Sequence, residues 1–201
     1  MKVTVAEPSK SLSRVKPSTR KPVRVALVQT RWHEDAAEHL SVLAEGIRLA
    51  AENGAQIVCL PELTLSRYPA DVLPTGIPNE TAEPLLDGPT FNFAAQAAQR
   101  HGVVVHASLY EFHDFADGRA LNTAIMVDPY GSLIGRTPKL HIPVTAGYYE
   151  DKYFQPGPNQ DPYPVYAVET PEGQAKFGLP TCWDEWFPEV ARNYSLRGAE
   201  V

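Results

Sequence analysis

Three polar residues follow apolar segments that lie far apart in the sequence. Glu62 comes directly after one short apolar run, Lys139 follows a second, and Cys182 stands where an apolar strand is predicted to end and a helix to begin. A carboxylate, an ammonium and a thiol can together act as proton-transfer group, stabiliser of developing negative charge and nucleophile. Because a helix N-terminus presents unpaired N–H groups and the positive end of its dipole, we expect it to lower the pKa of the Cys182 thiol.

Each of these residues also has a simpler interpretation. Cysteine is among the most buried residue types, so Cys182 alone would more often belong to a core than act as a nucleophile. Glu62 alone could cap a helix or a turn, and Lys139 alone could be a solvated loop lysine. Only the combination favours catalysis, whereas Cys59, inside an apolar strand, is expected to belong to the core.

Two other kinds of site are compatible with parts of the chain. A metal site is suggested by three histidines and a nearby acid, but their spacing fits no compact ligand motif. These residues are His101, His106, His113 and Asp114. A papain-like pair of Cys182 and His141 is the second alternative, although nothing in the sequence prepares that histidine for catalysis.

The composition restricts the class of protein. The chain has 201 residues, of which 43% are hydrophobic and 21% charged, and this suffices for one domain with a substantial core. The formal net charge of −6 argues against a phosphate-binding surface, so we predict no nucleic-acid partner. No apolar run has the length of a membrane span and the first residues lack a secretory signal, so we predict no membrane partner. Two cysteines do not form a disulfide framework, and a cytoplasmic location is expected.

Hydrophobic patterning predicts strands that alternate with helices and hairpins. Strands are predicted over residues 23–29, 56–60, 103–111, 121–127, 132–136, 163–169 and 174–179. Helices are predicted over residues 34–53, 89–100 and 187–197, the first with an apolar face formed by Ala36, Leu40, Leu43, Ile47 and Ala50. This layout indicates an α/β fold, classed as α+β in some schemes, in which mixed β-sheets are covered by helices. We expect residues 1–22, which are polar and basic, to form a flexible arm and residues 23–201 to form the domain.

Three short sequence blocks carry a resemblance to a known family. They are residues 60–63, 135–143 and 182–189, which hold the glutamate, the lysine and the cysteine described above. Each block alone is weak, but together and in this order they resemble the carbon–nitrogen hydrolases of the nitrilase superfamily. The resemblance covers about residues 23–201. It implies an αββα sandwich, in which two stacked β-sheets lie between layers of helices.

The resemblance implies a role for each polar residue. Cys182 matches the family's nucleophile, Glu62 its general base, and Lys139 the cation that supports the tetrahedral intermediate. Glu150 matches a second glutamate found near the active site in many members, and the backbone N–H of Trp183 matches a donor to the oxyanion. The implied reaction is hydrolysis of a non-peptide carbon–nitrogen bond through a thioester, and it requires no metal or organic cofactor.

Aromatic residues near these blocks are candidates for the substrate-binding wall. They are Trp183, Trp186 and Tyr148, for which hydrophobic packing is an equally good interpretation. Residues 182–189 are most similar to members that hydrolyse N-carbamoyl amines, so an amide or N-carbamoyl compound is the expected small-molecule substrate. A nitrilase or an aliphatic amidase is the alternative. The resemblance also implies a homo-oligomer.

Two features depart from the family's pattern. Pro180 would remove a hydrogen bond from a strand that leads to the cysteine, and Cys182 could thereby be displaced. Family members continue past Val201, so we expect a chain truncated at its C-terminus, with the last strands of the sandwich missing. Both features leave open a different class, a non-catalytic fragment or assembly module with the same fold.

Overall fold

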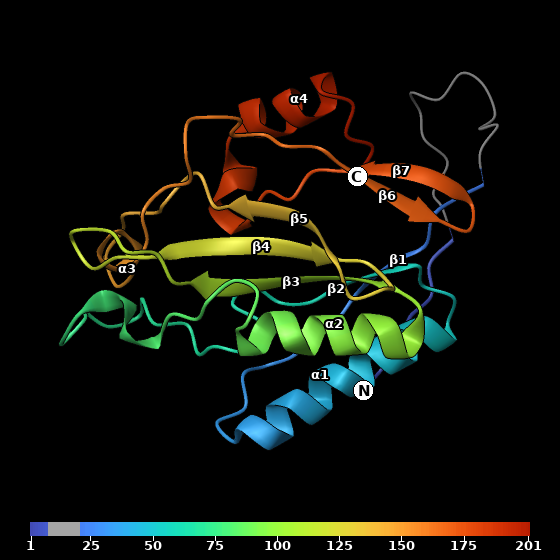
Figure 1. Ribbon diagram of the computed structural model, residues 1–201, viewed down its shortest axis with the longest axis horizontal. Helices are drawn as coiled ribbons and strands as arrows, with labels where there is room; N and C mark the ends of the chain where they lie inside the picture. Colours follow the sequence, from blue (N-terminus) through green and yellow to red (C-terminus); the bar gives the residue numbers. More distant parts are fainter. Residues whose placement is uncertain (8–20) are drawn as a thin grey trace.

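A mixed β-sheet lies at the centre of the computed structural model, which describes residues 1–7 and 21–201 (Figure 1). Most of the arm expected at residues 1–22 therefore lies outside the described residues. In spatial order the strands are β1 (Val25–Leu27), β2 (Ile57–Cys59), β3 (Val104–Glu111), β4 (Leu121–Val127) and β5 (Leu133–Pro138). The first three run parallel, and β3, β4 and β5 pair antiparallel, which confirms the predicted mixed sheet.

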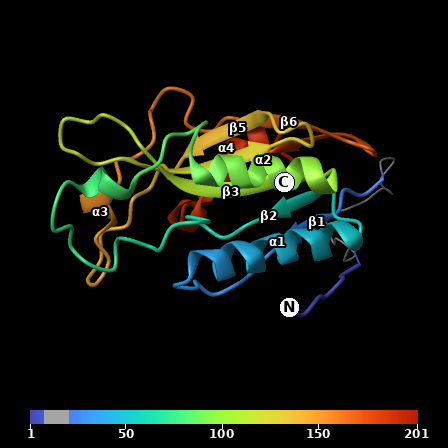
Figure 2. The same cartoon turned by 60° about the horizontal axis from the view of Figure 1, so that its bottom comes forward.

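Helices α1 (Ala36–Glu52) and α2 (Pro89–His101) cover one face of this sheet, as Figures 1 and 2 show. Their buried side chains share one apolar core with the sheet, which includes Leu43, Ile47, Ala94, Ala98, Val58, Val105 and Ile125. The predicted apolar face of α1 is wrong at its start, because Ala36 and Leu40 are exposed while His39 is buried. His39 points inward because its Nε2 atom lies 2.9 Å from the carbonyl oxygen of Thr64.

Local signals begin and end these helices within two residues of the predicted bounds, 34–53 and 89–100. The side chain of Asp35 caps α1 by accepting the N–H of Glu38. Pro89 takes the first position of α2, where a missing N–H is harmless, and Gly102 ends the helix with a left-handed φ of 63°. Among the described residues, no helix is both long enough and apolar enough to cross a membrane.

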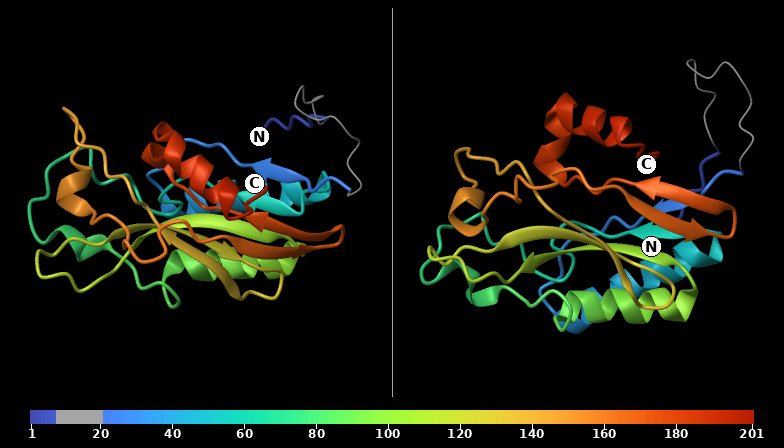
Figure 3. Two further views of the ribbon diagram at one scale, coloured as in Figure 1. Left: turned by 90° about the horizontal axis from the view of Figure 1, so that it is seen from above. Right: turned by 45° about the horizontal axis from the view of Figure 1, so that its top comes forward.

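A hairpin of β6 (Tyr166–Thr170) and β7 (Gly173–Phe177) packs on the other face of the central sheet (Figure 3). Its buried side chains meet those of the sheet in a second core, which includes Val168, Ala175, Phe177, Ile57, Val104, Ala124 and Met126. Helix α4 (Pro188–Leu196) lies outside the hairpin and buries Val190 and Tyr194. The layers therefore follow the predicted αββα order.

The long connections of the fold gather at one end of the central sheet, on the left in Figure 1. The segment between β2 and α2 includes the 3₁₀ helix η1 (Pro78–Thr81), and the segment between β5 and β6 includes α3 (Glu150–Tyr153). Leu63, Tyr110 and Phe154 belong to a third apolar core that anchors these segments. Because β2 and β5 finish at this end and β4 begins there, the residues next to these strand ends face one another.

Candidate active site

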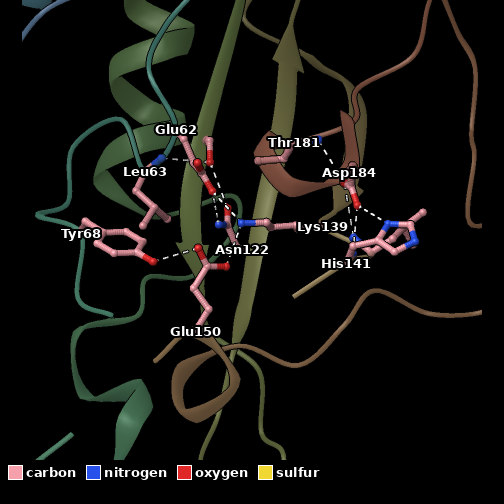
Figure 4. A network of polar contacts seen from close by, with 11 residues as sticks. Glu62, Leu63, Tyr68, Asn122, Lys139, His141, Glu150, Thr181 and Asp184 are labelled. Carbon is pink, nitrogen blue, oxygen red and sulfur yellow. Dashed lines mark hydrogen bonds and ion pairs between the residues drawn. The ribbon is translucent and has the colours of Figure 1, made fainter. Parts of the chain in front are cut away.

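Glu62, Lys139 and Glu150 meet at this end of the sheet and form a charged cluster (Figure 4). The Nζ atom of Lys139 lies 2.7 Å from Glu150 Oε2 and 3.2 Å from Glu62 Oε1. The side chain of Lys139 is fully buried and that of Glu150 almost so, whereas 28% of the Glu62 side chain is exposed. The two carboxylates satisfy the buried ammonium, and the exposed part of Glu62 remains accessible to a substrate.

The turn after β2 directs Glu62 toward the lysine. Leu63 has a φ of 50°, in the left-handed region that few non-glycine residues adopt. The hydroxyl of Ser108 on β3 accepts the N–H of Leu63 at 3.1 Å. The N–H of Ser108 donates to the hydroxyl of Thr64 at 3.0 Å, and the N–H of Thr64 donates to the Ser108 carbonyl at 2.8 Å. These hydrogen bonds connect the turn to β3 and so hold Glu62 beyond the C-terminal end of β2.

Two further residues complete the cluster, and the sequence patterns assign no role to either. Asn122 Nδ2 donates to Glu62 Oε1 at 2.6 Å, and the hydroxyl of Tyr68 donates to Glu150 Oε1 at 2.9 Å. The available signal for Asn122 is an amide at the start of a buried strand, at the sheet end where Glu62 lies. Tyr68 belongs to a long irregular loop, and no periodicity or spacing points to it.

Cys182 begins the 3₁₀ helix η2 (Cys182–Trp186), which precedes α4. The residue as a whole is exposed although its thiol is partly buried, and its φ of 50° is a strained conformation of the kind that clusters at functional sites. Pro180 lies beyond the end of β7, so it removes no hydrogen bond from that strand. Cys59, expected in the core, is half-buried and packs against the core between the sheets.

The thiol of Cys182 lies within reach of the charges of the cluster. Partial burial of the thiol and the negative charge of Glu62 raise the pKa of Cys182 to about 11, and the positive charge of Lys139 offsets part of this rise. The lowered pKa expected from a helix N-terminus is therefore wrong. The helix that begins at this position is a short 3₁₀ helix, and burial and the nearby carboxylates raise the pKa of the thiol. With this raised pKa the Cys182 thiol is neutral at pH 7 and would need a base to act as a nucleophile.

The buried ion pair changes the pKa values of both partners. Burial acts to lower the pKa of Lys139, but Glu62 and Glu150 outweigh it, so the pKa is raised above its usual value. Burial raises the pKa of Glu150, and the hydrogen bonds from Lys139 and Tyr68 offset only part of that rise. Lys139 is therefore a permanent cation at neutral pH, beside a carboxylate that is protonated more easily than an exposed one.

Of the aromatic residues predicted to bind substrate, Trp183 and Trp186 lie on η2 after Cys182, and Tyr148 contacts Tyr68, which bonds Glu150. Trp183 is half-buried, with its ring centroid 5.3 Å from that of Trp186, which is 69% exposed. Tyr148 is 54% exposed and its ring lies 6.4 Å from that of Tyr68. Cavities of about 640 and 610 Å³ lie elsewhere, along β1 and the N-terminal residues. Neither of these two cavities is lined by a residue of the charged cluster.

The structure does not favour the alternative sites. The charged groups that act on the thiol of Cys182 are Glu62, Lys139 and Glu150, whereas the ring of His141 bonds Asp184, with Nδ1 2.7 Å from Oδ1. His106 lies on β3 opposite Met126, whereas His101 is the last residue of α2. Within the described ranges, no three His, Cys, Asp or Glu residues are grouped as metal ligands would be.

The αββα layers match the fold of a solved nitrilase-superfamily structure, that of Nit3 from Saccharomyces cerevisiae. A sequence model described as carbon-nitrogen hydrolase matches residues 24–201, and the chain belongs to this family, as predicted. The chain is 35% identical over 180 residues to a citrullinase of Francisella tularensis. It is 32% identical over 179 residues to an N-carbamoylputrescine amidase of Solanum tuberosum.

A solved structure supports the same fold. The crystal structure of a carbon-nitrogen hydrolase from Helicobacter pylori G27 is similar with a TM-score of 0.70 at 28% sequence identity, and the match covers 89% of this chain and 57% of that one. The two curated relatives are likewise matched by 89% of this chain, over 59% and 56% of their own lengths. The chain therefore spans less than two thirds of the length of each of these relatives.

Proposed function

We propose that this protein hydrolyses a non-peptide carbon–nitrogen bond, in an amide or an N-carbamoyl group, through a thioester on Cys182. The observation that supports this most is the contact of Lys139 with Glu62, which is 77 residues away in the sequence, within reach of the thiol. Membership of the carbon-nitrogen hydrolase family supports the reaction class. A nucleophile, a base and a buried cation are the groups that such a reaction needs.

Glu62 is the general base of the proposed reaction. Its partly exposed carboxylate accepts the thiol proton as the sulfur of Cys182 attacks the carbonyl carbon. Because the pKa of the thiol is raised to about 11, little thiolate exists beforehand, and attack and proton transfer occur together. Asn122 holds the carboxylate in place through its bond to Oε1. Glu62 then gives the proton to the leaving nitrogen.

Lys139 stabilises the negative charge that collects on the substrate oxygen. Its ammonium is held by Glu62 and Glu150 before any substrate binds, so little reorganisation is needed in the transition state. The backbone N–H of Trp183 is the second donor. Donors placed in advance in this way are commonly worth roughly 3–4 kcal/mol each.

Water completes the reaction. Ammonia or an amine leaves with the proton from Glu62, and the acyl group stays on the sulfur of Cys182 as a thioester. Glu62, again a carboxylate, takes a proton from a water molecule that attacks the acyl carbon, and the thiol is then restored. With an N-carbamoyl substrate, the products of both steps are an amine, carbon dioxide and ammonia.

An N-carbamoyl compound is the preferred substrate in this proposal. The names of the citrullinase and N-carbamoylputrescine amidase relatives support it. Trp183, which follows Cys182 in the chain, and Tyr148, whose ring contacts Tyr68, offer flat aromatic faces against which a planar group can pack. A simple amide or a nitrile is the alternative substrate for the same residues.

The proposal extends to the setting of the reaction. The protein acts on a small molecule as a cytoplasmic homo-oligomer, without a metal or organic cofactor, a nucleic acid or a membrane. The net charge of −6 supports the exclusion of nucleic acid. The competing interpretation is a non-catalytic module that has the same fold.

Ammonia release from a panel of N-carbamoyl amines, amides and nitriles tests the proposal, with Cys182→Ala as the control. We expect release from at least one N-carbamoyl compound or amide, complete dependence on Cys182, and a substrate-derived acyl adduct on this residue by mass spectrometry. Ammonia release that persists in Cys182→Ala would exclude Cys182 as the nucleophile. A folded protein that releases nothing from the whole panel would favour the non-catalytic module.

A further inference from the structure

A buried carboxylate, Asp184, joins the segment that carries Cys182 to the segment that carries Lys139, on the right in Figure 4. Its Oδ2 atom accepts the N–H of Thr181, directly before the cysteine, at 3.0 Å. Its Oδ1 atom accepts the backbone N–H of His141, two residues after the lysine, at 2.9 Å. Asp184 is only 1% exposed, and the low dielectric constant of the protein interior makes these hydrogen bonds stronger than they would be in water.

The ring of His141 strengthens this connection. Its Nδ1 atom lies 2.7 Å from the same Oδ1 atom of Asp184, and its plane stacks on Phe187 with centroids 4.0 Å apart and an interplanar angle of 19°. Phe187 is the residue between η2 and α4. The loop after β5 and the turn at Cys182 are therefore joined by a bonded carboxylate and by a stacked ring pair.

Cys182 needs such support because its backbone is strained. A φ of 50° in a non-glycine residue persists only when its surroundings impose it. The flanking residues form a capping box, in which the Thr181 side chain accepts the N–H of Asp184 and the Asp184 side chain accepts the N–H of Thr181. The strained residue lies between the two members of this box.

We propose that Asp184 is a positioning residue that sets the distance and orientation of the Cys182 thiol relative to Lys139 and Glu62. This inference rests on the proposed function for its kinetic consequence, but not for its structural one. Asp184 touches no reacting atom. It acts through Thr181 on one side and His141 on the other.

Asp184→Asn is the sharpest test, because an amide has the shape of the carboxylate but only one oxygen. The NH₂ group must face the N–H groups of either Thr181 or His141, so one of the two connections is lost. Glu83→Gln is the matched control. Glu83 is also a buried carboxylate, and it caps α2 by accepting the N–H of Thr90 at 2.8 Å and the hydroxyl of the same residue at 2.5 Å.

The deciding measurement is the rate of Cys182 alkylation by iodoacetamide as a function of pH, followed by mass spectrometry on the full chain. In Asp184→Asn the thiol moves away from the charge of Glu62, and we expect the midpoint of this profile to fall by about one pH unit or more. Glu83→Gln is expected to lower the melting temperature and leave the midpoint unchanged. An unchanged midpoint in folded Asp184→Asn, or an equal shift in Glu83→Gln, would overturn the proposal.

Turnover provides the second readout. With an active substrate, Asp184→Asn is expected to lower kcat by about 10- to 100-fold and to change KM by less than about threefold, because misplacement acts on the reacting centre. A wild-type protein that releases no ammonia contradicts the proposed function, while the alkylation midpoint still decides the role of Asp184. If Asp184→Asn does not fold, His141→Phe keeps the stacked ring and removes one donor. Its midpoint is expected to shift in the same direction by a smaller amount, and an unchanged midpoint would overturn the proposal.

Discussion

The ammonium of Lys139 lies 2.7 Å from the carboxylate of Glu150, and both side chains are almost completely removed from solvent. The pair joins the residue after β5 to the first residue of α3, 11 positions further along the chain. A buried pair of this kind adds little net stability, but the loss of one partner leaves a charge without compensation. In the proposed reaction, this pair holds the ammonium at the position where negative charge develops on the substrate.

The replacement Lys139→Met is expected to lower the free energy of unfolding by about 3–5 kcal/mol, because Glu150 then remains buried without its cation. Denaturant unfolding followed by circular dichroism measures this change. Lys152→Met is the matched control, since the Lys152 side chain is 53% exposed and bonds the neighbouring Asp151 at 2.6 Å. Lys152→Met is expected to lower the free energy of unfolding by less than about 1 kcal/mol. Similarly small losses in both variants would contradict a buried ion pair at Lys139.

The replacement Asn122→Leu is expected to lower kcat/KM by about 10- to 100-fold, because a hydrogen bond to a charged group is worth about 1.5–3 kcal/mol. The lost bond is the one from Asn122 Nδ2 to Glu62 Oε1. Thr123→Val is the control on the same strand, since its hydroxyl donates at 2.6 Å to Glu111, on the opposite face of the sheet. The rate of ammonia release, measured under identical conditions, gives kcat/KM for Asn122→Leu and for Thr123→Val. Equal losses in the two variants would point to general damage to β4.

Alkylation of the two cysteines is expected to be slow at pH 7. Burial raises the pKa of both Cys59 and Cys182 to about 11, and only the thiolate reacts. Because a raised pKa means less thiolate at neutral pH, the rate at Cys182 should rise about tenfold per pH unit up to about pH 11. Iodoacetamide labelling resolved by mass spectrometry gives the two profiles separately. A Cys182 profile with a midpoint below pH 8 would show that its charge environment differs from the one described.

His106 is expected to make the protein less stable in mild acid. Burial lowers its pKa from 6.5 to about 4, and within the described residues its Nδ1 atom has no hydrogen-bond partner. Between these two values the unfolded chain binds a proton that the folded chain does not, so the free energy of unfolding falls as the pH drops from 6.5 to 4. The loss of free energy of unfolding that His106 causes reaches up to about 3 kcal/mol at pH 4.

Denaturant unfolding between pH 4 and pH 7 checks this dependence. His106→Phe should flatten the profile over that range, whereas His113→Gln, at an exposed loop position, should leave it as in the wild-type protein. A wild-type profile that is already flat would mean that His106 is protonated in the folded state.

Most of the elements could be predicted from the sequence, because their signals are local. Helix α2 begins at Pro89 and ends before Gly102, and these residues act on their own backbone. The inward face of α1 could not be predicted in full. His39 is buried because it bonds Thr64, a residue 25 positions away, and no periodicity within the helix contains that information.

Some residues of the candidate site could likewise be predicted from the sequence, and others could not. The chemical types of Glu62, Lys139 and Cys182, and their positions at the ends of elements, were determined by the sequence alone. Tyr68 and Asn122 were not, because their roles depend on which segments meet at one end of the sheet. That meeting follows from strand order and packing, which involve residues from the whole domain.

The sequence by itself determined the family, the layered α/β architecture and the chemical types of the candidate site residues, because motifs and hydrophobic patterns are properties of neighbouring residues. Only the tertiary structure decided the direction of the pKa shift at Cys182 and the connection from Asp184 to His141. A pKa shift is the balance of burial and charges that act through space. A hydrogen bond between distant segments likewise requires the folded backbone, so neither can be read from the order of the residues.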